Sequence, residues 1–556
     1  MLLSGSDIIV KTLIEQGSDV VFGYPGGQIL NVYDSLYKYQ NEITHVLAAH
    51  EQGAAHAADG YARSTGKVGV VISTSGPGAT NLVTGIATAY LDSVPMVAIC
   101  GNVPTTQIGT DSFQEIDITG VTLPITKHNF FVGNVEQLAD TIREAYKLAK
   151  SGRPGPVLVD VPKDVQIAMC EYEPQAPVEA EKKFAAKDIR INAAAECINN
   201  AERPYIYFGG GAIAGNAQEE MLALAEAIDA PIGCSMMGLS GIPTDHPRFL
   251  GMQGMHGHYA SSMAMHHADV IISLGVRFND RVTGNRAKFA RKAKIVQIDI
   301  DGSELSKNIE SHYGLRGDVK ETLKKLLPLI KKKSQPDWQK QIGEFKEKEL
   351  AGADNRPGLT PANAIRTVNK HLEKGTVVAT DVGQHQMWSA QHLNFKSNRT
   401  FASSGGLGTM GYGLGAAIGA AYGSGQRSVL ITGDGSFGMC LNELATATTY
   451  NVPVVILIMN NGVLGMVRQW QTLFYEKHYS NTVLNRKTDF TALAKAFGAE
   501  GERVETVDAL DEALGRAFKY QGPYVIDCAI DKDEFVLPML PPGGSMDDII
   551  VKKGEQ

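Results

Sequence analysis

The apolar positions of the chain fall into short runs separated by stretches of helical length. Two such runs are Ser428 to Thr432 and Val452 to Met459, and between them Met439 to Asn451 carries apolar side chains at helical spacing. This order predicts a strand, a helix and a second strand. A unit of this length is nearly always right-handed and parallel, so both strands should end at the same edge of one sheet.

The same order occurs a second time, much earlier in the chain. Residues 68–100 and 428–460 both run from an apolar strand through a glycine loop into a helix rich in Ala and Thr, then through Val-Pro into another strand. The interval from Gly78 to Pro95 spans 17 positions and that from Gly435 to Pro453 spans 18. Two strand-helix-strand units can agree by chance, but this shared register favours a duplicated fold.

Two polar stretches divide the chain. Glu171 to Arg190 and Lys331 to Thr360 are charged and contain proline, which predicts surface linkers, each with room for a helix. Three blocks remain, 1–170, 191–335 and 360–540, which we call the first, middle and third blocks. We expect an α/β protein of three doubly wound domains with parallel sheets.

Composition excludes several classes of protein. The chain has 556 residues, 43% of them hydrophobic and 20% charged, and a net charge of −8, which argues against binding to nucleic acid or an anionic membrane. No stretch approaches the roughly 20 apolar residues of a membrane span. The N-terminus carries Asp7 and Glu15 and has no basic region, so we expect a folded helix there and not a signal peptide. Six scattered cysteines without a CxxC pair indicate reduced thiols and a cytoplasmic enzyme.

The two strands of the third block end at residues suited to a metal and a phosphate. Gly433-Asp434-Gly435 follows the first strand and Asn460-Asn461 ends the second. Ligands of open α/β sheets bind at the carboxyl edge. A carboxylate and an amide oxygen are suitable ligands for Mg²⁺, which keeps its other coordination positions for phosphate oxygens. The helix that starts after Gly435 offers free N–H groups to the phosphate. The first motif alone is more often a turn, but its combination with the asparagines predicts a metal–phosphate site.

The middle block carries a weaker ligand pattern. A strand from Tyr205 to Phe208 precedes the glycine-rich residues 209–215 and a helical run to Ala230. Taken alone, tight packing is the better explanation of such a turn. Asp299 and Asp318 follow later strands, where acidic side chains meet ribose hydroxyls in nucleotide-binding sheets. Together these positions favour a nucleotide site.

The metal–phosphate motif and the duplicated blocks resemble the thiamine diphosphate enzymes. Within them, nearly the whole chain resembles the biosynthetic, FAD-containing acetohydroxyacid synthase catalytic subunits. The matching segments are YPGGQILNVYD (24–34), GTDSFQEID (109–117), SGRPGPVLVDVPKDV (151–165), GVRFNDRVTG (275–284), VGQHQMW (382–388), GGLGTMGYG (405–413) and NNGVLGMVRQWQ (460–471). Departures are limited to a few positions in the flavin segments GMQGMHG and FNDR.

The resemblance implies roles for particular residues. Glu51 would be the catalytic residue and would hydrogen-bond the aminopyrimidine ring. Without the resemblance, the simpler explanation of Glu51 is a glutamate stabilised near a helix N-terminus by the helix dipole. Asp434, Asn461 and Val463 would hold Mg²⁺. The residues that would bind thiamine diphosphate are Tyr24, Pro25, Gly26, Glu51, Thr74, Pro77, Asn81, Gln114, Val382, Gly383, Gln384, His385, Gly408, Met410, Gly433, Asp434, Gly435, Ser436, Asn461, Val463, Leu464, Gly465 and Met466.

Two further sets follow from the resemblance. The residues that would touch FAD are Arg153, Gly209, Gly210, Gly254, Met255, His256, Gly257, Gly275, Arg277, Asp299 and Asp318. Those that would line the substrate channel are Gly27, Phe113, Lys163, Arg281, Met466 and Trp470. Arg281 would bind the carboxylate of the acceptor substrate, and Trp470 would contact the alkyl group of that substrate. A structural ion pair for Arg281 and core packing for Trp470 are the alternatives.

The implied activity is that of an acetolactate synthase in isoleucine and valine biosynthesis. Pyruvate would lose CO₂ on thiamine diphosphate, and the remaining unit would be ligated to a second pyruvate or to 2-ketobutyrate. No flavin redox step is needed, so FAD would be structural or inherited. In this family the first block would bind the pyrimidine, the middle block FAD and the third block the diphosphate. The family also implies a homodimer or homotetramer whose active sites lie between subunits, and leaves room for a small regulatory subunit.

Three other functions are to be weighed. A pyruvate oxidase would share both cofactors but pass electrons to FAD. A glyoxylate carboligase typically has an apolar residue at the position of Glu51. A non-catalytic flavin protein would not need Glu51, Asp434 and Asn461 together.

Overall fold

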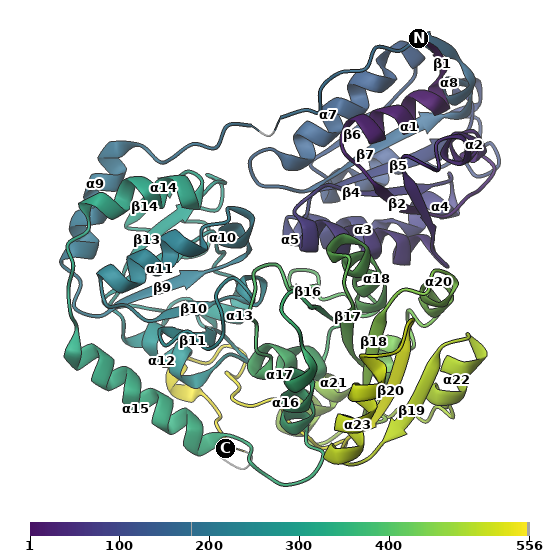
Figure 1. Ribbon diagram of the computed structural model, residues 1–556. Coiled ribbons are helices and arrows are strands. Elements are labelled where there is room, and N and C mark those ends of the chain that lie inside the picture. The colour runs from purple at the N-terminus through teal and green to yellow at the C-terminus, as the bar shows by residue number, and fades with distance from the viewer. Residues whose placement is uncertain (180, 553–556) are drawn as a thin grey trace.

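The computed structural model describes residues 1–179 and 181–552 and contains three six-stranded sheets (Figure 1). Every strand pair in these sheets is parallel, which confirms the predicted α/β fold. A short antiparallel ribbon joins β1 (Leu2–Ser4) to β8 (Met169–Glu171).

The first sheet has the order β3-β2-β4-β5-β7-β6. Helices α1, α2 and α7 bury their apolar sides on one face, and α3 and α5 on the other, so the sheet is doubly wound. The elements are α1 (Gly5–Glu15), β2 (Val20–Gly23), α2 (Leu30–Lys38), β3 (Thr44–Leu47), α3 (Glu51–Thr65), β4 (Gly69–Ser73), α4 (Pro77–Asn81), α5 (Val83–Asp92), β5 (Met96–Asn102), α6 (Ile118–Thr122), β6 (His128–Phe131), α7 (Leu138–Lys150), β7 (Pro156–Pro162) and α8 (Lys163–Ile167).

The third sheet has the order β16-β15-β17-β18-β20-β19. Counted from its own first strand, this is the same order as in the first sheet, so the duplication predicted from spacing holds for the whole topology. The elements are α16 (Pro361–His371), β15 (Val377–Thr380), α17 (Gln384–His392), β16 (Phe401–Ser403), α18 (Gly413–Ser424), β17 (Ser428–Gly433), α19 (Asp434–Phe437), α20 (Glu443–Thr449), β18 (Val454–Asn460), α21 (Gly465–Phe474), α22 (Phe490–Ala496), β19 (Glu500–Val504), α23 (Val507–Ala517) and β20 (Tyr524–Ala529).

The middle sheet differs from the other two. Its order, β11-β10-β9-β12-β13-β14, is the one that dinucleotide-binding folds use, with the switch point beside the first strand. The elements are α9 (Asp188–Asn199), β9 (Pro204–Phe208), α10 (Gly210–Ala214), α11 (Gln218–Ala227), β10 (Ile232–Cys234), β11 (Phe249–Met252), α12 (Tyr259–His267), β12 (Val270–Leu274), α13 (Asp280–Thr283), β13 (Lys294–Asp299), β14 (Tyr313–Arg316) and α14 (Val319–Leu326).

The polar stretches connect these sheets. In the first, residues 172–187 contain no helix or strand where the structure describes them; residue 180 lies outside the described residues. The second stretch holds the long helix α15 (Pro336–Gly352). Short 3₁₀ turns occur elsewhere, at Thr105–Gln107, Leu123–Ile125, Val135–Gln137, Met236–Gly238, Leu327–Leu329 and Met546–Asp548.

Two predicted helices differ from expectation. Of the expected helix from Met439 to Asn451, only α20 is helical, residues 439–442 form a turn, and the short helix α19 lies before the expected range. The expected run to Ala230 is divided into α10 and α11, because Asn216 has a φ of 52° and a left-handed residue ends a helix.

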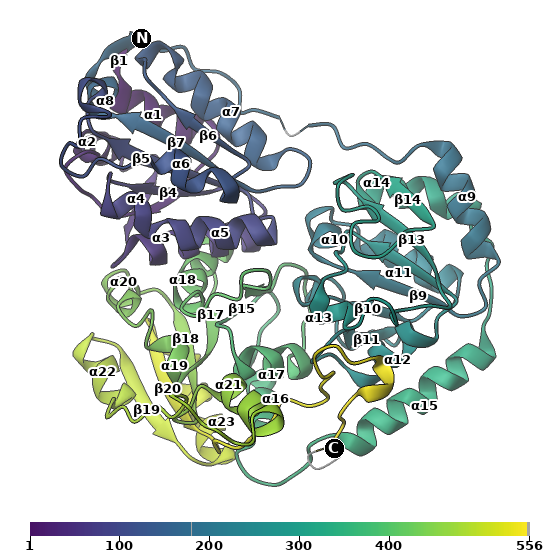
Figure 2. The ribbon, with the colours of Figure 1, turned by 180° about the vertical axis from the view of Figure 1, so that it is seen from behind.

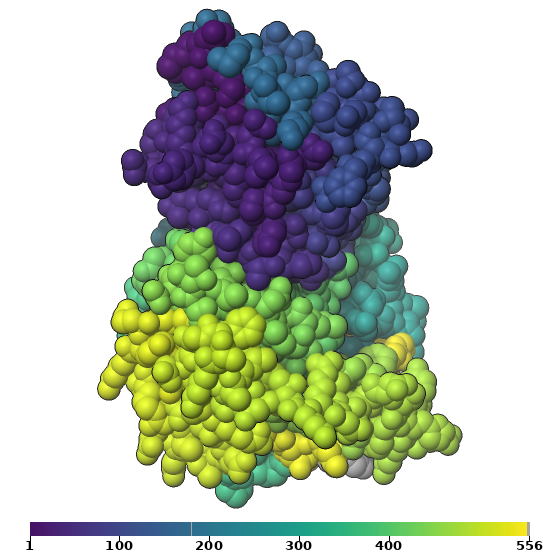
Figure 3. All heavy atoms as spheres, turned by 90° about the vertical axis from the view of Figure 1, so that its right-hand side faces the viewer, coloured from purple at the N-terminus to yellow at the C-terminus, as the bar shows by residue number. Residues whose placement is uncertain are grey.

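Helices α3 and α18 join the first sheet to the third. Small residues let their backbones approach closely: a Cβ added to Gly419 would lie 1.8 Å from the Ala57 carbonyl oxygen, and one added to Gly60 2.1 Å from that of Ala416. Figure 1 shows this helix pair between the two sheets, and Figure 3 shows the first block resting on the third with part of the middle block behind them.

The C-terminal segment returns to the middle block. The backbone N–H of Leu540 donates to the carbonyl oxygen of Met255 at 2.7 Å, and residues of this segment run past α12 and α13 (Figure 2). Among the residues that the structure describes, no helix combines the length and the apolar character required to cross a bilayer.

Candidate active site

Asp434 and Asn461 emerge side by side at the carboxyl edge of the third sheet. Strands β17 and β18 pair in register up to Gly433 and Met459, so the residues that follow them lie at one edge, as predicted. Asp434 is the first residue of α19 and is only 6% exposed. Burial raises the pKa of its carboxyl group to about 6.

The surroundings of Asp434 fit a divalent cation. Its Oδ1 atom is buried and has no hydrogen-bond partner among the described residues. A cation restores the stabilisation that such an oxygen loses on leaving water. The backbone N–H of Val463 donates to Asn461 Oδ1 at 3.2 Å, which holds that amide beside the carboxylate. No group of three His, Cys, Asp or Glu residues suited to a metal occurs in the described chain, so a cation here would rely on amide, backbone and phosphate oxygens.

The other predicted residues of the third block surround this edge. A Cβ on Gly433 would lie 3.0 Å from His385 Nδ1, and one on Gly465 2.0 Å from Gln384 Oε1. Gly435 likewise leaves no room beside Leu464, and its ideal Cβ would lie 3.9 Å from Met410 Cε. A side chain at any of these three glycines would collide with His385, Gln384 or Leu464, so the close packing at this edge requires glycine.

Glu51 lies at the corresponding edge of the first sheet. It is the first residue of α3, is 8% exposed and accepts a hydrogen bond from Asn81 Nδ2 at 2.9 Å. Thr74 packs on Gly26, and Gly76 packs on Gln114, so the loops after β2 and β4 enclose it. The residues assembled here are Tyr24, Pro25, Gly26, Glu51, Thr74, Pro77, Asn81 and Gln114.

Three predicted channel residues belong to the same side of the molecule. Lys163 Nζ donates to the carbonyl oxygen of Gly27 at 3.2 Å, and Phe113 is 83% exposed. Most of this ring is open to solvent in the part of the chain that the structure describes.

Glu51 makes no contact with Asp434 or Asn461 among the described residues. The one hydrogen bond that its side chain accepts comes from within the first block. The large cavity described next is lined by none of Glu51, Asp434 and Asn461. We call the edge with Glu51 and the edge with Asp434 the two half-sites.

A cavity of about 1640 Å³ lies between the middle block and the other two. Its lining includes eight of the predicted FAD residues and three of the predicted channel residues: Arg153, Gly210, Met255, His256, Gly275, Arg277, Asp299, Asp318, Arg281, Met466 and Trp470. Gly209, Gly254 and Gly257 lie next to it and support its wall. Gly27, Phe113 and Lys163 are not in its lining.

The cavity fits a large dinucleotide such as FAD. It lies beside a sheet with the dinucleotide-binding strand order, and it is larger than most small-molecule pockets. Gln253 Oε1 and His256 Nδ1, on residues that line it, are buried without a partner among the described residues. Desolvation lowers the pKa of His256 to about 4, so this ring is neutral at pH 7.

Some acidic and basic residues of the FAD set already have protein partners. Arg153 Nη1 forms ion pairs with Glu304 at 3.0 Å and Asp301 at 3.5 Å. Asp318 caps α14 and pairs with Lys183 at 3.2 Å. These pairs hold charged groups around the cavity in place before any ligand enters.

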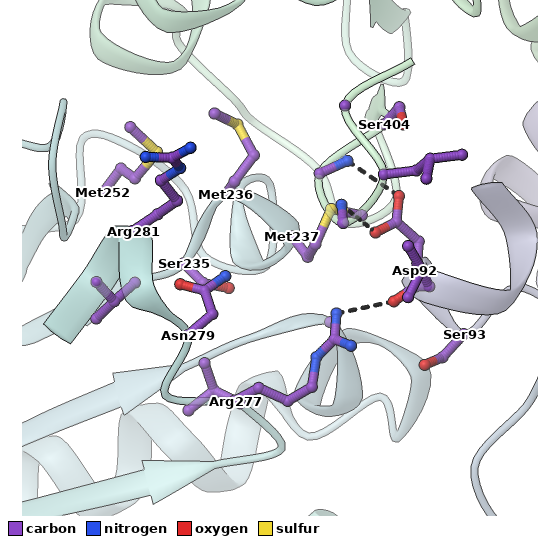
Figure 4. Close-up of a pocket in the computed structure, with 18 of the residues that line it drawn as sticks. Asp92, Ser93, Ser235, Met236, Met237, Met252, Arg277, Asn279, Arg281 and Ser404 are labelled. Carbon is purple, nitrogen blue, oxygen red and sulfur yellow. Dashed lines mark hydrogen bonds between the residues drawn. The ribbon is translucent and has the colours of Figure 1, made fainter. Parts of the chain in front are cut away.

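Sequence reasoning missed part of the cavity wall. Asp92, Met236, Met237, Gln253 and Arg399 line it as well. They come from helix ends and loops in all three blocks. Gln253 lies within the flavin segment GMQGMHG, whereas no local motif marks the others, because only packing brings them together. Figure 4 shows several of them around the cavity.

Replacing Asp434 by Asn is expected to stabilise the cofactor-free protein at pH 7.5. Because folding raises the pKa of Asp434 from 3.8 to about 6, the cost of burying the ionised carboxylate is full above pH 6 and vanishes below about pH 4. The neutral amide removes that cost, so the free energy of unfolding in urea should rise by about 2–3 kcal/mol at pH 7.5 and stay unchanged near pH 4.

The same variant should no longer be stabilised by Mg²⁺ with thiamine diphosphate, whereas the wild type should be. A variant that is less stable at pH 7.5, or is still stabilised by Mg²⁺, would remove Asp434 from the metal site.

Three protein-family models match separate parts of the chain. Residues 3–121 match the thiamine pyrophosphate enzyme N-terminal TPP binding domain, residues 191–326 the central domain, and residues 381–528 the C-terminal TPP binding domain.

Individual relatives match over the full length. The chain is 44% identical to a probable acetolactate synthase large subunit of Methanocaldococcus jannaschii, over 99% of this chain and 95% of that protein. It is 43% identical to acetolactate synthase isozyme 2 large subunit of Escherichia coli, over 99% and 100%. It is 41% identical to the acetolactate synthase large subunit of Haemophilus influenzae, over 100% and 99%. The chain is therefore a thiamine pyrophosphate enzyme and belongs to the family of acetolactate synthase large subunits.

Proposed function

We propose that this protein is an acetolactate synthase, which decarboxylates pyruvate and ligates the remaining two-carbon unit to a second 2-ketoacid. One observation carries the proposal. Equivalent edges of two duplicated sheets hold Glu51 on one side and Asp434 with Asn461 on the other, in a chain that matches this family from end to end. When bound, thiamine diphosphate supplies the electron sink for decarboxylation.

Glu51 orients and activates the pyrimidine end of the cofactor. The Asn81 amide holds its Oε2 atom, and the Oε1 atom faces Gly78, where a Cβ would come within 3.1 Å. A carboxyl group fixed in this way and shielded from water forms a short, directional hydrogen bond to a ring nitrogen. With the cofactor bound, this hydrogen bond would favour the imino tautomer of the ring.

Asp434, Asn461 and Val463 hold Mg²⁺ against the diphosphate in this proposal. The unpaired Asp434 Oδ1 atom is the observation that supports it. Gly383, Gly433 and Gly435 give backbone N–H groups access to phosphate oxygens. The metal and the diphosphate would bind together, since phosphate oxygens fill the coordination positions of Mg²⁺ that the protein leaves open.

FAD would occupy the cavity of the middle block. No oxidation or reduction is needed to join two 2-ketoacids with loss of CO₂. We therefore assign FAD a structural role, which the next subsection develops.

Arg281 and Trp470 select the acceptor substrate in this proposal. Arg281 lines the cavity, with a side chain 63% exposed and only a loose pair to Asp280 at 3.8 Å, so its guanidinium is available to a carboxylate. Trp470 packs edge-on against Phe474 at 5.7 Å and also lines the cavity. It would contact the methyl of pyruvate or the ethyl of 2-ketobutyrate.

The active site would be completed by a second copy of the chain. Glu51 contacts neither Asp434 nor Asn461 among the described residues of one chain, and Tyr24 and Phe113 are exposed beside Glu51. A homodimer, or a tetramer built from two dimers, would bring Glu51 of one subunit to the metal site of the other. The relatives are called large subunits, so a small regulatory subunit would be a further partner. Six free cysteines fit the reducing cytoplasm.

The decisive experiment identifies the product. Purified protein with pyruvate, thiamine diphosphate, Mg²⁺ and FAD should yield acetolactate, and added 2-ketobutyrate should yield acetohydroxybutyrate, both detected by mass. Acetate with bleaching of the flavin absorbance would show a pyruvate oxidase. Acetaldehyde as the main product would show a simple decarboxylase.

A further inference from the structure

Asp92 lies where all three blocks meet, and the proposed reaction gives it no role. It is the last residue of α5, and its side chain is 0% exposed. Its carboxylate accepts hydrogen bonds from the backbone N–H of Gly405 at 3.0 Å and of Gly406 at 2.7 Å. These glycines lie more than 300 positions further along the chain, at the start of a loop of the third block.

A buried arginine completes the partners of Asp92. Arg63 Nη2 donates to Asp92 Oδ2 at 2.9 Å, and its Nε pairs with Asp59 at 2.5 Å. Tyr412 donates its hydroxyl to the same Asp59 at 2.6 Å. Each charged side chain in this group has an oppositely charged partner and hydrogen bonds. Buried charges that are paired in this way favour a single arrangement of the side chains.

The loop that Asp92 holds separates the cavity from the metal half-site. Residues 405–408 line the cavity, and the chain reaches Met410 beside Gly435 only two residues later. Between them, Thr409 Oγ1 bonds to Thr88 at 2.9 Å and to Ser404 at 3.2 Å. A shift of the loop would therefore move the cavity wall and the thiamine site together.

The loop has no freedom to shift without disturbing Asp92. A Cβ on Gly406 would lie 2.9 Å from both Asp92 Oδ1 and the Leu91 Cβ, and one on Gly405 2.4 Å from Met237 Sδ. The middle block adds its own contact, because Arg277 Nη2 donates to the Leu91 carbonyl oxygen at 2.8 Å. Figure 4 shows the Asp92 carboxylate turned toward the loop and Arg277 reaching toward the end of α5.

We propose that Asp92 is a positioning residue that couples occupation of the flavin cavity to binding of thiamine diphosphate, by holding the loop of residues 405–408 against Arg63. The inference rests on the proposed function and gives the flavin a purpose without redox chemistry. A ligand that fills the cavity presses on one side of the loop and orders the other side, where Met410 meets the thiamine cofactor. By linkage, each cofactor then strengthens binding of the other by the same factor.

The test measures both affinities in the dimeric protein, thiamine diphosphate with Mg²⁺ by calorimetry and FAD by quenching of its fluorescence. In the wild type, FAD should tighten thiamine diphosphate binding by a factor within the roughly 5- to 150-fold range of such couplings, and thiamine diphosphate should tighten FAD binding equally. Asp92→Asn should reduce this factor to near one, because an amide cannot accept from Arg63 and both glycines together.

Two other variants guard against a trivial loss of folding. Gly406→Ala keeps every charge but displaces the loop, and should lower the coupling factor as well. Asp160→Asn is the matched control: Asp160 is an equally buried carboxylate of the first block, bonded to Asn102 at 2.7 Å and remote from the loop. Its coupling factor should equal that of the wild type.

The outcomes separate this inference from the proposed function. A wild type that binds neither cofactor would overturn the function itself. A wild type that binds both cofactors, with the same coupling factor in Asp92→Asn and Gly406→Ala, would overturn only the role of Asp92. Loss of coupling in Asp160→Asn as well would show a general effect of buried charge and would also overturn it.

Discussion

Glu51→Gln should fold, bind both cofactors and lose activity by a factor of about 10²–10⁴, the usual contribution of a positioned proton donor or acceptor. The amide has the shape of the carboxyl group and keeps a hydrogen bond to Asn81, so packing is preserved. It does not share a proton with the pyrimidine ring, so the tautomer needed for activation of the cofactor is lost. Exchange of the thiazolium C2 proton, followed by NMR after acid quench, should slow by a similar factor.

A matched control is Glu220→Gln. Glu220 also lies in the first turn of a helix, α11, and its side chain is 11% exposed, with a loose pair to Lys320 at 3.5 Å. This variant should keep full activity and a normal C2 exchange rate. Unchanged exchange in Glu51→Gln would remove Glu51 from its catalytic role, whatever the effect on turnover.

A mixture of inactive Glu51→Gln and inactive Asp434→Ala subunits should regain activity. In a mixed dimer, the intact Glu51 of one chain meets the intact Asp434 of the other at one site, while the second site carries both defects. Random pairing through a two-fold interface gives one good site in every mixed dimer, so an equal mixture should reach roughly a quarter of wild-type activity. The measurement is acetolactate formation after subunit exchange.

Exchange itself must be followed separately, for example by mass spectrometry of differently tagged subunits. Mixed dimers without activity would mean that each chain builds its own site. Activity in either variant alone would show that the replaced residue is dispensable.

Most of the fold was predictable because its information is local. The apolar runs at Ser428 to Thr432 and Val452 to Met459 form buried strands. The length of chain between them indicates a crossover between parallel strands, and such crossovers are nearly always right-handed. Glu51 follows β3 and Asp434 follows β17, and each begins a helix at the start of the crossover to the next strand. Their positions relative to their own sheets therefore follow from residues close to them in the chain.

Helix boundaries were less predictable, for an equally local reason. Apolar spacing continues across Asn216 and through residues 439–442, although the backbone is not helical at either place. Periodicity records which side chains face the core, and it is insensitive to one turn of altered backbone.

The sequence by itself determined the three α/β blocks, the duplicated order of the outer two and the residues at each carboxyl edge, because these depend on short-range spacing and on motifs within one crossover. Only the tertiary structure decided that the cavity draws its wall from three blocks and that Asp92 accepts hydrogen bonds from a loop more than 300 positions away. Those relations depend on how closely α3 and α18 pack and on which buried charges find partners. Both are properties of surfaces assembled from distant segments, and no local pattern encodes them.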